Sequence, residues 1–344
     1  MVTLLHRPFL LELRHPFRLA LGMRTYTNAV LTELHFDGQV GYGEAAMPPY
    51  YGETQASAAA FLDQAAAVLR HRRYPFDLPT LMARIDDIAP GNHAAKASVD
   101  IALHDLWGKL ENRPVWQLLG GIDPEKMPPT SFTIGMDTPE VLRQKVAEAG
   151  GFQILKIKLG SEDDRAIIRT IREVSALPIY ADANQAWTDR EAALDLIHWL
   201  AEQNVQLIEQ PTPKDDLAAA AWLTARSPLP IIADESFQRL TDLDRIADCF
   251  HGVNIKLMKC TGLSEGYRIV QAARERGLKI LIGCMTETSC GIRAAAQIAP
   301  LCDYADLDGC WLIRNNPFAA PELVDGKIRL GETAGLGLEH LNLG

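Results

Sequence analysis

The sequence predicts an α/β fold, in which a parallel barrel of eight strands and seven helices is joined to a smaller α+β domain. Short apolar runs alternate with helical patterns from about residue 128 to residue 307, and each run ends in one or two polar residues. Charged side chains at the ends of successive parallel strands converge only if the strands close into a barrel, where catalytic groups collect at the carboxyl-terminal face. The polar residues that end the runs are Lys158, Asp182, Glu209, Asp234, Lys256, Glu287, Asp306 and Asp308.

The length and charge of the chain exclude several classes of protein. Its 344 residues suit a barrel of roughly 200 to 250 residues plus a smaller domain. The net charge is -10 and Lys and Arg do not cluster, so we expect no nucleic-acid partner. No apolar run reaches roughly 18 residues and the N-terminus has no signal-like core, so we expect no membrane span and a cytoplasmic location. The cysteines lack CxxC spacing and the histidines lack an HExxH motif, so we expect reduced thiols and no zinc site.

Residues 1–125 do not follow the alternation of strand and helix. Strand-like runs come first and helical patterns follow, which suggests an α+β domain. The runs lie at residues 4–13, 29–36 and 40–44, and the helical patterns at 53–70, 78–87 and 93–111. Residues 21–28, with Arg24, and residues 47–53, with Tyr50 and Tyr51, are typical of loops. The Gly-Tyr-Gly at 41–43 lacks the GxGxxG pattern, so a phosphate site is not expected there.

Helix starts in the barrel region are marked by capping residues. Thr138 before a proline is typical of an N-cap, Ser161 precedes an acidic turn, and Thr188 with Glu191 forms the pattern of a capping box. The expected helices lie between strands at 130–134 and 304–307, at residues 138–149, 161–175, 188–203, 215–225, 239–247, 262–277 and 289–299.

The C-terminal tail carries a different pattern. Residues 322–324 and 327–330 flank an Asp-Gly pair and predict a hairpin, in a tail that returns to the first domain instead of forming an eighth barrel helix. The expected domains are therefore residues 1–125 together with 317–344, and residues 126–316.

Three carboxylates stand at consecutive strand ends, and they are Asp182, Glu209 and Asp234. Carboxylate oxygens are hard ligands suited to Mg²⁺, which keeps positions open for water or substrate. Without a cation the three charges would repel each other, so a bound metal explains them better than a structural role. Asn184 and Glu235 are neighbours that could orient the ligands.

Two lysines flank these carboxylates along the chain. Residues 155–160 alternate apolar and charged side chains, so Lys156 and Lys158 share one face of a strand, while Lys256 stands on the strand after the ligands. Lysine has an ordinary pKa of about 10.4. Lys156, the metal and partial burial would lower the pKa of Lys158 and make it a usable general base. We expect proton abstraction next to a carboxylate, with Mg²⁺ stabilising the enediolate, and two bases on opposite faces predict racemisation or epimerisation.

Five motifs together resemble the enolase superfamily, in its muconate-lactonising subgroup, over nearly the whole chain. They are KIK at 156–158, DANQAW at 182–187, EQP at 209–211, ADES at 233–236 and NIKLMK at 254–259. The resemblance implies a modified (β/α)7β barrel of the TIM type, capped by an α+β domain built from both chain ends. It also implies that two loops of the cap close over the substrate, which places Arg24 and either Tyr50 or Tyr51 beside it.

The segment YADLDG resembles the dipeptide epimerases of this subgroup, whose paired aspartates hold the free α-ammonium group of the substrate. The resemblance assigns that role to Asp306 and Asp308, and it places the α-carbon of the second residue between Lys158 and Lys256. Thr133 and Met285 fall at other strand ends and are expected to line the pocket.

Arg24 resembles the arginine that pairs with the side-chain carboxylate of the second residue in Ala-Glu epimerases. An L-Ala-containing dipeptide, above all Ala-Glu, is therefore the expected substrate, and murein peptide metabolism is the expected context. We also expect one Mg²⁺ per subunit, with Mn²⁺ as a substitute, and a homo-oligomer.

Other functions stay open at this point. An o-succinylbenzoate synthase, a muconate-type cycloisomerase or an N-acylamino acid racemase would use the same scaffold, but their substrates have no free ammonium group for Asp306 and Asp308. A Schiff-base aldolase would use one lysine and no carboxylate triad, and a non-catalytic barrel would bind a ligand without turning it over. Lys259 and the region of Trp311 receive no role.

Overall fold

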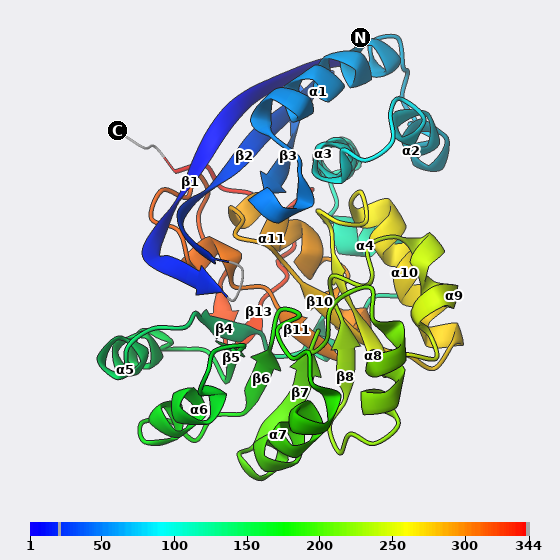
Figure 1. The fold of residues 1–344 in the computed structure, drawn as a ribbon. Coiled ribbons are helices and arrows are strands. Elements are labelled where there is room, and N and C mark those ends of the chain that lie inside the picture. The colour runs from blue at the N-terminus through cyan, green and yellow to red at the C-terminus, as the bar shows by residue number, and fades with distance from the viewer. Residues whose placement is uncertain (20–21, 342–344) are drawn as a thin grey trace.

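The computed structural model describes residues 1–19 and 22–341, and it consists of a barrel and a cap (Figure 1). The cap begins with an antiparallel sheet in the order β1-β2-β3, followed by four helices. Their bounds are β1 Thr3–Leu19, β2 Gly22–Phe36, β3 Gln39–Met47, α1 Gln55–Leu69, α2 Leu78–Asp86, α3 His93–Leu110 and α4 Val115–Leu119. The predicted order of strands and then helices is confirmed.

Helix α3 lies directly against β3, and the Gly-Tyr-Gly segment allows this contact. A Cβ atom on Gly43 would collide with the carbonyl oxygen of Ser98 in α3, and one on Gly41 would collide with that of Ala102. Glycine therefore lets a helix backbone approach a strand backbone here. The segment serves packing inside the cap.

The loop predicted at residues 21–28 is wrong, because β1 and β2 form one long ribbon. Arg24 lies on β2 and pairs with Phe17 of β1, while Leu21 lies outside the described residues. This end of the ribbon projects toward the mouth of the barrel (Figure 1). Met23 and Tyr26 are exposed, so the ribbon lacks the alternation of buried and exposed residues by which a strand is recognised.

The barrel sheet is parallel, and its order from β11 to β4 follows the chain without a crossover. A bridge between Thr130 and Ala305 brings the first and last strands together, so the sheet is nearly closed. The strands are β4 Ser131–Ile134, β5 Ile154–Lys158, β6 Ile179–Asp182, β7 Val205–Glu209, β8 Ile231–Ala233, β9 Gly252–Lys256, β10 Lys279–Gly283 and β11 Tyr304–Asp306. This arrangement confirms the predicted barrel.

Seven α-helices connect these strands. They are α5 Pro139–Glu148, α6 Asp164–Arg172, α7 Arg190–Glu202, α8 Leu217–Thr224, α9 Leu243–Ile246, α10 Leu263–Glu275 and α11 Ser289–Ala296. Two predicted caps are wrong by one or two residues. The N-cap of α6 is Asp163 and not Ser161, and the N-cap of α7 is Asp189 and not Thr188, whose capping box does not form. In both cases an aspartate closer to the helix accepts the first free N–H groups.

The inside of the barrel is apolar in its middle and polar at its mouth, which is formed by the carboxyl-terminal ends of the strands. Ile154, Tyr180, Leu207, Ile232 and Leu281 form a separate buried cluster, one residue from each of five strands. Two residues further along four of the same strands come the lysines and carboxylates of the mouth, because residues i and i+2 of a strand face the same side. The apolar cluster therefore forms the floor on which the polar groups stand.

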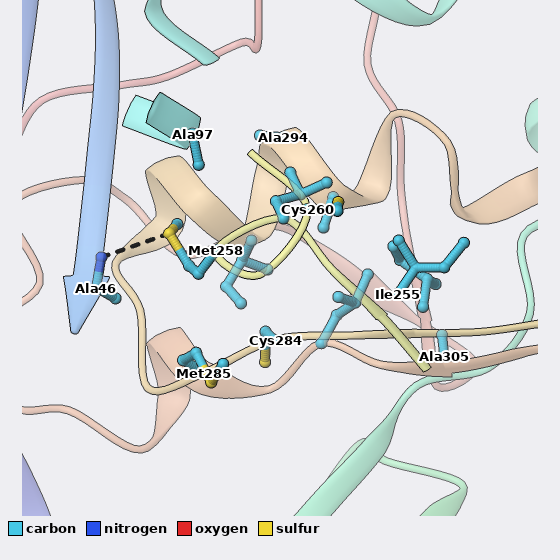
Figure 2. Close-up of a cluster of buried hydrophobic side chains, with 14 of the residues drawn as sticks. Ala46, Ala97, Ile255, Met258, Cys260, Cys284, Met285, Ala294 and Ala305 are labelled. Carbon is cyan, nitrogen blue, oxygen red and sulfur yellow. Dashed lines mark hydrogen bonds between the residues drawn. The ribbon is translucent and has the colours of Figure 1, made fainter. Parts of the chain in front are cut away.

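The cap is fastened to the barrel at several points. Glu44 of β3 is fully buried and accepts hydrogen bonds from the N–H groups of Thr288 (2.8 Å) and Gly291 (3.1 Å) at the start of α11. Figure 2 shows Met258, from the loop after β9, beside the end of β3, where the N–H of Ala46 lies 3.4 Å from its sulfur. Such contacts fix the cap over the carboxyl-terminal face of the barrel.

The C-terminal tail contacts both parts of the molecule. The predicted hairpin forms, as β12 (Leu323–Val324) and β13 (Lys327–Ile328), but its turn packs against Gln153 and Thr130 at the opposite end of the barrel. The segment after the hairpin returns to the cap, where Leu336 N donates to Asp105 of α3 at 2.8 Å, and Phe318, before the hairpin, packs against Tyr42 of β3. We propose that the barrel domain spans residues 126–316, as predicted. The hairpin, although it follows this range, contacts the barrel. No helix among the described residues combines the length and apolarity needed to cross a membrane.

Candidate active site

The predicted charged residues converge at the mouth of the barrel. Lys158, Asp182 and Glu209 end β5, β6 and β7, Asp234 directly follows β8, and Lys256 ends β9. All five are buried, at 7 % exposed surface or less. Register explains the meeting, since Lys158 pairs with Asp182 and Asp182 pairs with Glu209 across the sheet.

The three carboxylates form a compact ligand set. One oxygen from each of Asp182, Glu209 and Asp234 lies within 4.8 Å of the others. Burial and the nearby Asp182 raise the pKa of Glu209 to about 7. Burial acts in the same direction on Asp234, but Lys256 and Lys259 hold the pKa of Asp234 well below its usual value. The ligands thus differ, because burial and Asp182 favour a proton on Glu209 whereas lysines keep Asp234 ionised.

Some buried oxygen atoms of residues next to the three carboxylates lack a hydrogen-bond donor, and they indicate whether a metal ion fits here. Asn184 Oδ1, Glu235 Oε2 and Asn254 Oδ1 are buried without a hydrogen-bond partner. Asn184 donates to Glu235 Oε1 at 3.2 Å, which joins the two residues predicted to orient the ligands. Buried oxygens without donors favour a cation with bound water, because they can accept hydrogen bonds from that water. The residues present therefore fit Mg²⁺.

The two lysines flank the ligands as predicted. Lys158 Nζ donates to Asp182 Oδ2 at 2.6 Å, and Lys256 Nζ donates to Asp234 Oδ2 at 2.8 Å. Burial would lower the pKa of Lys256, but Asp234 and Glu209 raise it well above its usual value. Both ammonium groups thus contact carboxylates that would hold a cation.

Lys156 has a different setting from the one expected. Its Nζ lies 2.7 Å from both Glu209 Oε2 and Asp306 Oδ2, and 3.1 Å from Asp182 Oδ2. Burial opposes ionisation, yet these carboxylates raise the pKa of Lys156 well above its usual value. The positive charge of Lys156 is thus neutralised by three carboxylates, which it bridges. It is not the unpaired cation that was expected to lower the pKa of Lys158.

The two aspartates of the last strand differ from each other. Asp306 ends β11 and accepts hydrogen bonds from Lys156 (2.7 Å) and Ser131 Oγ (2.7 Å). Asp308 lies beyond the strand, where its Oδ2 accepts the N–H of Thr133 at 2.5 Å. Burial and Asp306 raise the pKa of Asp308 to about 7. Asp308 is therefore the carboxylate with capacity left for a ligand cation.

Arg24 reaches the mouth from the ribbon of the cap. Its Nη2 donates to Thr286 Oγ1 at 3.2 Å, its guanidinium lies over the ring of Phe17, and its Nε has no partner. Burial lowers the pKa of Arg24. None of its contacts among the described residues is a carboxylate. A buried guanidinium without a counter-ion is suited to an anionic ligand.

Tyr50 and Tyr51 enclose the mouth from the other side. The hydroxyl of Tyr50 lies 3.9 Å from the sulfur of Met285, and the hydroxyl of Tyr51 is buried without a partner. Both tyrosines, Met285 and Glu235 line a cleft of about 280 Å³ between cap and barrel. A larger cleft of about 1130 Å³ runs along the C-terminal tail and contains none of the predicted site residues.

Three residues of the site were missed by the sequence analysis. Gln210 accepts the N–H of Asp234 at 2.9 Å, Asn254 donates to Glu209 Oε1 at 2.8 Å, and Lys259 donates to Asp234 Oδ1 at 2.5 Å. A lysine between apolar residues in NIKLMK was a signal for burial, because lysine is rarely buried unless it is paired.

Fold and site together define a parallel barrel that carries a buried carboxylate triad, flanked by two lysines, at its carboxyl-terminal face. Residues 2–120 match the family described as Mandelate racemase / muconate lactonizing enzyme, N-terminal domain, and residues 140–341 match Enolase C-terminal domain-like. The chain therefore belongs to the enolase superfamily.

Several proteins to which the chain is similar are epimerases. The L-Ala-D/L-Glu epimerase of Bacteroides thetaiotaomicron is 50% identical over 332 residues, which are 96% of this chain and 86% of that protein. The solved dipeptide epimerase of Enterococcus faecalis, complexed with Mg and L-Leu-L-Tyr, has a TM-score of 0.91 at 35% identity and covers 98% of this chain and 99% of its own. The substrate-liganded L-Ala-D/L-Glu epimerase of Bacillus subtilis has a TM-score of 0.89 at 28% identity and covers 97% of both chains.

Proposed function

We propose that this protein is a Mg²⁺-dependent dipeptide epimerase that inverts the α-carbon of the second residue of L-Ala-containing dipeptides, above all Ala-Glu. The buried guanidinium of Arg24, which no carboxylate neutralises, carries the choice of an acidic second residue. The 50% identical relative from Bacteroides, named for L-Ala and Glu, supports it. The Enterococcus enzyme, solved with L-Leu-L-Tyr, shows that the same scaffold binds other dipeptides.

The chain supplies each function that the reaction needs. Asp308, with Asp306 beside it, would hold the α-ammonium group, and Arg24 would hold the side-chain carboxylate. Lys158 and Lys256, on strands to either side of the ligands, would remove the α-proton from one face and return a proton to the other. Both lysines are buried, which limits the access of bulk water to the reacting atoms. Asp182, Glu209 and Asp234 would hold Mg²⁺, which would supply positive charge next to the negative charge that develops on the substrate.

Proton NMR in D2O tests the reaction. Purified protein with Mg²⁺ should exchange the α-proton of the second residue of L-Ala-L-Glu, and signals of the diastereomer should grow. A panel of other L,L-dipeptides measures preference. Exchange with another dipeptide but not with Ala-Glu would keep the epimerase and remove the role of Arg24. No exchange at all would return o-succinylbenzoate synthase, cycloisomerase and N-acylamino acid racemase activities to consideration.

The charge of Arg24 can be tested separately. Arg24→Glu should lower kcat/KM for Ala-Glu by at least about 100-fold, since it replaces a charge-assisted contact by repulsion. A dipeptide with an uncharged second residue serves as the control, because its turnover should fall much less. Intact Ala-Glu turnover in the variant would exclude the assignment.

We also propose the finer expectations that accompany this function. Oxygen ligands of the kind present suit Mn²⁺ as well as Mg²⁺, so Mn²⁺ should support turnover. An Ala-Glu substrate places the enzyme in murein peptide metabolism, in the cytoplasm. We also propose that the protein forms a homo-oligomer.

A further inference from the structure

Lys259 is a buried charge that the proposed mechanism does not use. Its side chain is 1% exposed, and its ammonium group contacts four oxygens. They are Asp234 Oδ1 at 2.5 Å, Asp234 O at 2.8 Å, Phe237 O at 2.9 Å and Asn254 O at 3.1 Å. Burying an ammonium group is costly unless it is paired and hydrogen-bonded, so these contacts need a reason.

The three ligands are held in three different ways. Asp182 Oδ1 accepts the N–H of Asn184 at 3.0 Å, and Glu209 Oε1 accepts the neutral amide of Asn254 at 2.8 Å. Lys156 also contacts Asp182 Oδ2 at 3.1 Å and Glu209 Oε2 at 2.7 Å. Asp234 differs, because its Oδ1 is held by the ammonium group of Lys259. Its remaining oxygen, Oδ2, contacts Lys256 at 2.8 Å.

The backbone of Asp234 is held as well. Its N–H donates to Gln210 Oε1 at 2.9 Å, and its carbonyl accepts from Lys259. Lys259 also binds the carbonyl of Asn254, whose side chain holds Glu209. Lys259 therefore connects two of the three ligands, and it leaves Asp234 one oxygen to offer.

We propose that Lys259 is a positioning residue that restricts Asp234 to one ligand oxygen and thereby makes the site prefer Mg²⁺ over the larger Ca²⁺. Mg²⁺ demands near-octahedral geometry, whereas Ca²⁺ accepts carboxylates through both oxygens and tolerates irregular sites. An Asp234 free to rotate would suit Ca²⁺ and penalise Mg²⁺. The inference rests on the proposed metal function and not on the identity of the substrate.

The test compares metal affinities of the whole protein after Lys259→Met, which keeps the length of the side chain and removes its charge. Isothermal titration calorimetry should show Mg²⁺ affinity reduced about 10- to 100-fold, as for other residues that orient metal ligands. Ca²⁺ affinity should change much less, so the ratio of Ca²⁺ to Mg²⁺ affinity rises. Equal changes for both ions, or unchanged Mg²⁺ affinity, would overturn the proposal.

Two further variants make the result specific. Lys96→Met removes another fully buried lysine, paired with Asp86 in the cap at 2.7 Å, and should leave both affinities as they are. If Lys259→Met does not fold, Lys259→Gln takes its place, because the polar but shorter side chain also releases Asp234 and must shift the same ratio. Failure to epimerise any dipeptide, with Mg²⁺ binding intact, would contradict the proposed substrate and leave this inference standing.

Discussion

The mouth of the barrel and the junction between cap and barrel both bury lysine beside carboxylate. The junction cluster consists of Lys96, Asp86, Arg239 and Glu265, where Lys96 donates to Asp86 at 2.7 Å and Arg239 Nη2 donates to Glu265 at 2.7 Å. These distances match the 2.6 Å between Lys158 and Asp182 at the mouth. The ion pairs themselves therefore do not distinguish a site from a structural anchor.

What distinguishes the two regions is how completely their charges are satisfied. At the junction, hydrogen bonds from Arg239 and Lys96 outweigh burial and hold the pKa of Asp86 below its usual value. At the mouth, burial and Asp182 raise the pKa of Glu209 to about 7, and oxygens of Asn184 and Asn254 have no donor. The junction is complete as folded, whereas the mouth is complete only with a cation and a substrate.

Removing either catalytic lysine should have the largest effect. We expect Lys158→Ala and Lys256→Ala each to reduce epimerisation about 10³-fold, the size typical of a lost general base. Each variant should still exchange the α-proton of one diastereomer with D2O, and a different one in each case. Chiral chromatography and NMR measure both. Variants that lose exchange from the same diastereomer would contradict a base on each face.

The pH dependence of metal binding should sharpen the contrast. Because the pKa of Glu209 is about 7 in the folded protein and ordinarily 4.5, the metal-free fold binds the extra proton between these values, and its stability falls as pH rises through that window. Mg²⁺ must displace this proton at low pH. We expect binding to be roughly 30-fold weaker at pH 5.5 than at pH 8, by calorimetry, since affinity falls tenfold per unit below the pKa. Binding independent of pH would place the cation elsewhere.

A substitution at the junction should lower the stability of the protein and leave its turnover nearly unchanged. Lys96→Met should lower the free energy of unfolding by about 2 kcal/mol, because it removes one partly buried hydrogen bond to a charged group. Urea unfolding measures this loss. Turnover should stay within about twofold, as distant sites act independently. A large loss of kcat in a folded variant would break the distinction drawn between the two clusters.

The barrel and its ring of charges could be predicted because they depend on periodicity. Lys158, Asp182, Glu209 and Lys256 each end an apolar run, and the closure of the sheet then determines where they meet. The family resemblance placed Arg24 near the site, but the sequence pattern predicted a loop where the structure has a strand. An exposed two-stranded ribbon has no buried face, so its sequence does not show the alternation typical of a strand.

The residues that support the ligands could not be predicted from the sequence, for a different reason. Lys259 and Gln210 act through hydrogen bonds to residues on other strands, and no spacing along the chain encodes those pairings. The separate tasks of Asp306 and Asp308 could not be seen either. The resemblance assigned both the same role, whereas β11 ends at Asp306 and Asp308 lies beyond it, where it accepts the N–H of Thr133.

Glu44 makes the barrel dependent on its own cap. Its carboxylate, carried by β3 of the cap, is the acceptor at the start of α11 in the barrel. A barrel given a foreign cap by recombination would lose this acceptor and leave the N–H groups of Thr288 and Gly291 buried without a partner. The two parts are therefore expected to be inherited together, and new specificities would arise by changing the ribbon and the tyrosine segment rather than by exchanging caps.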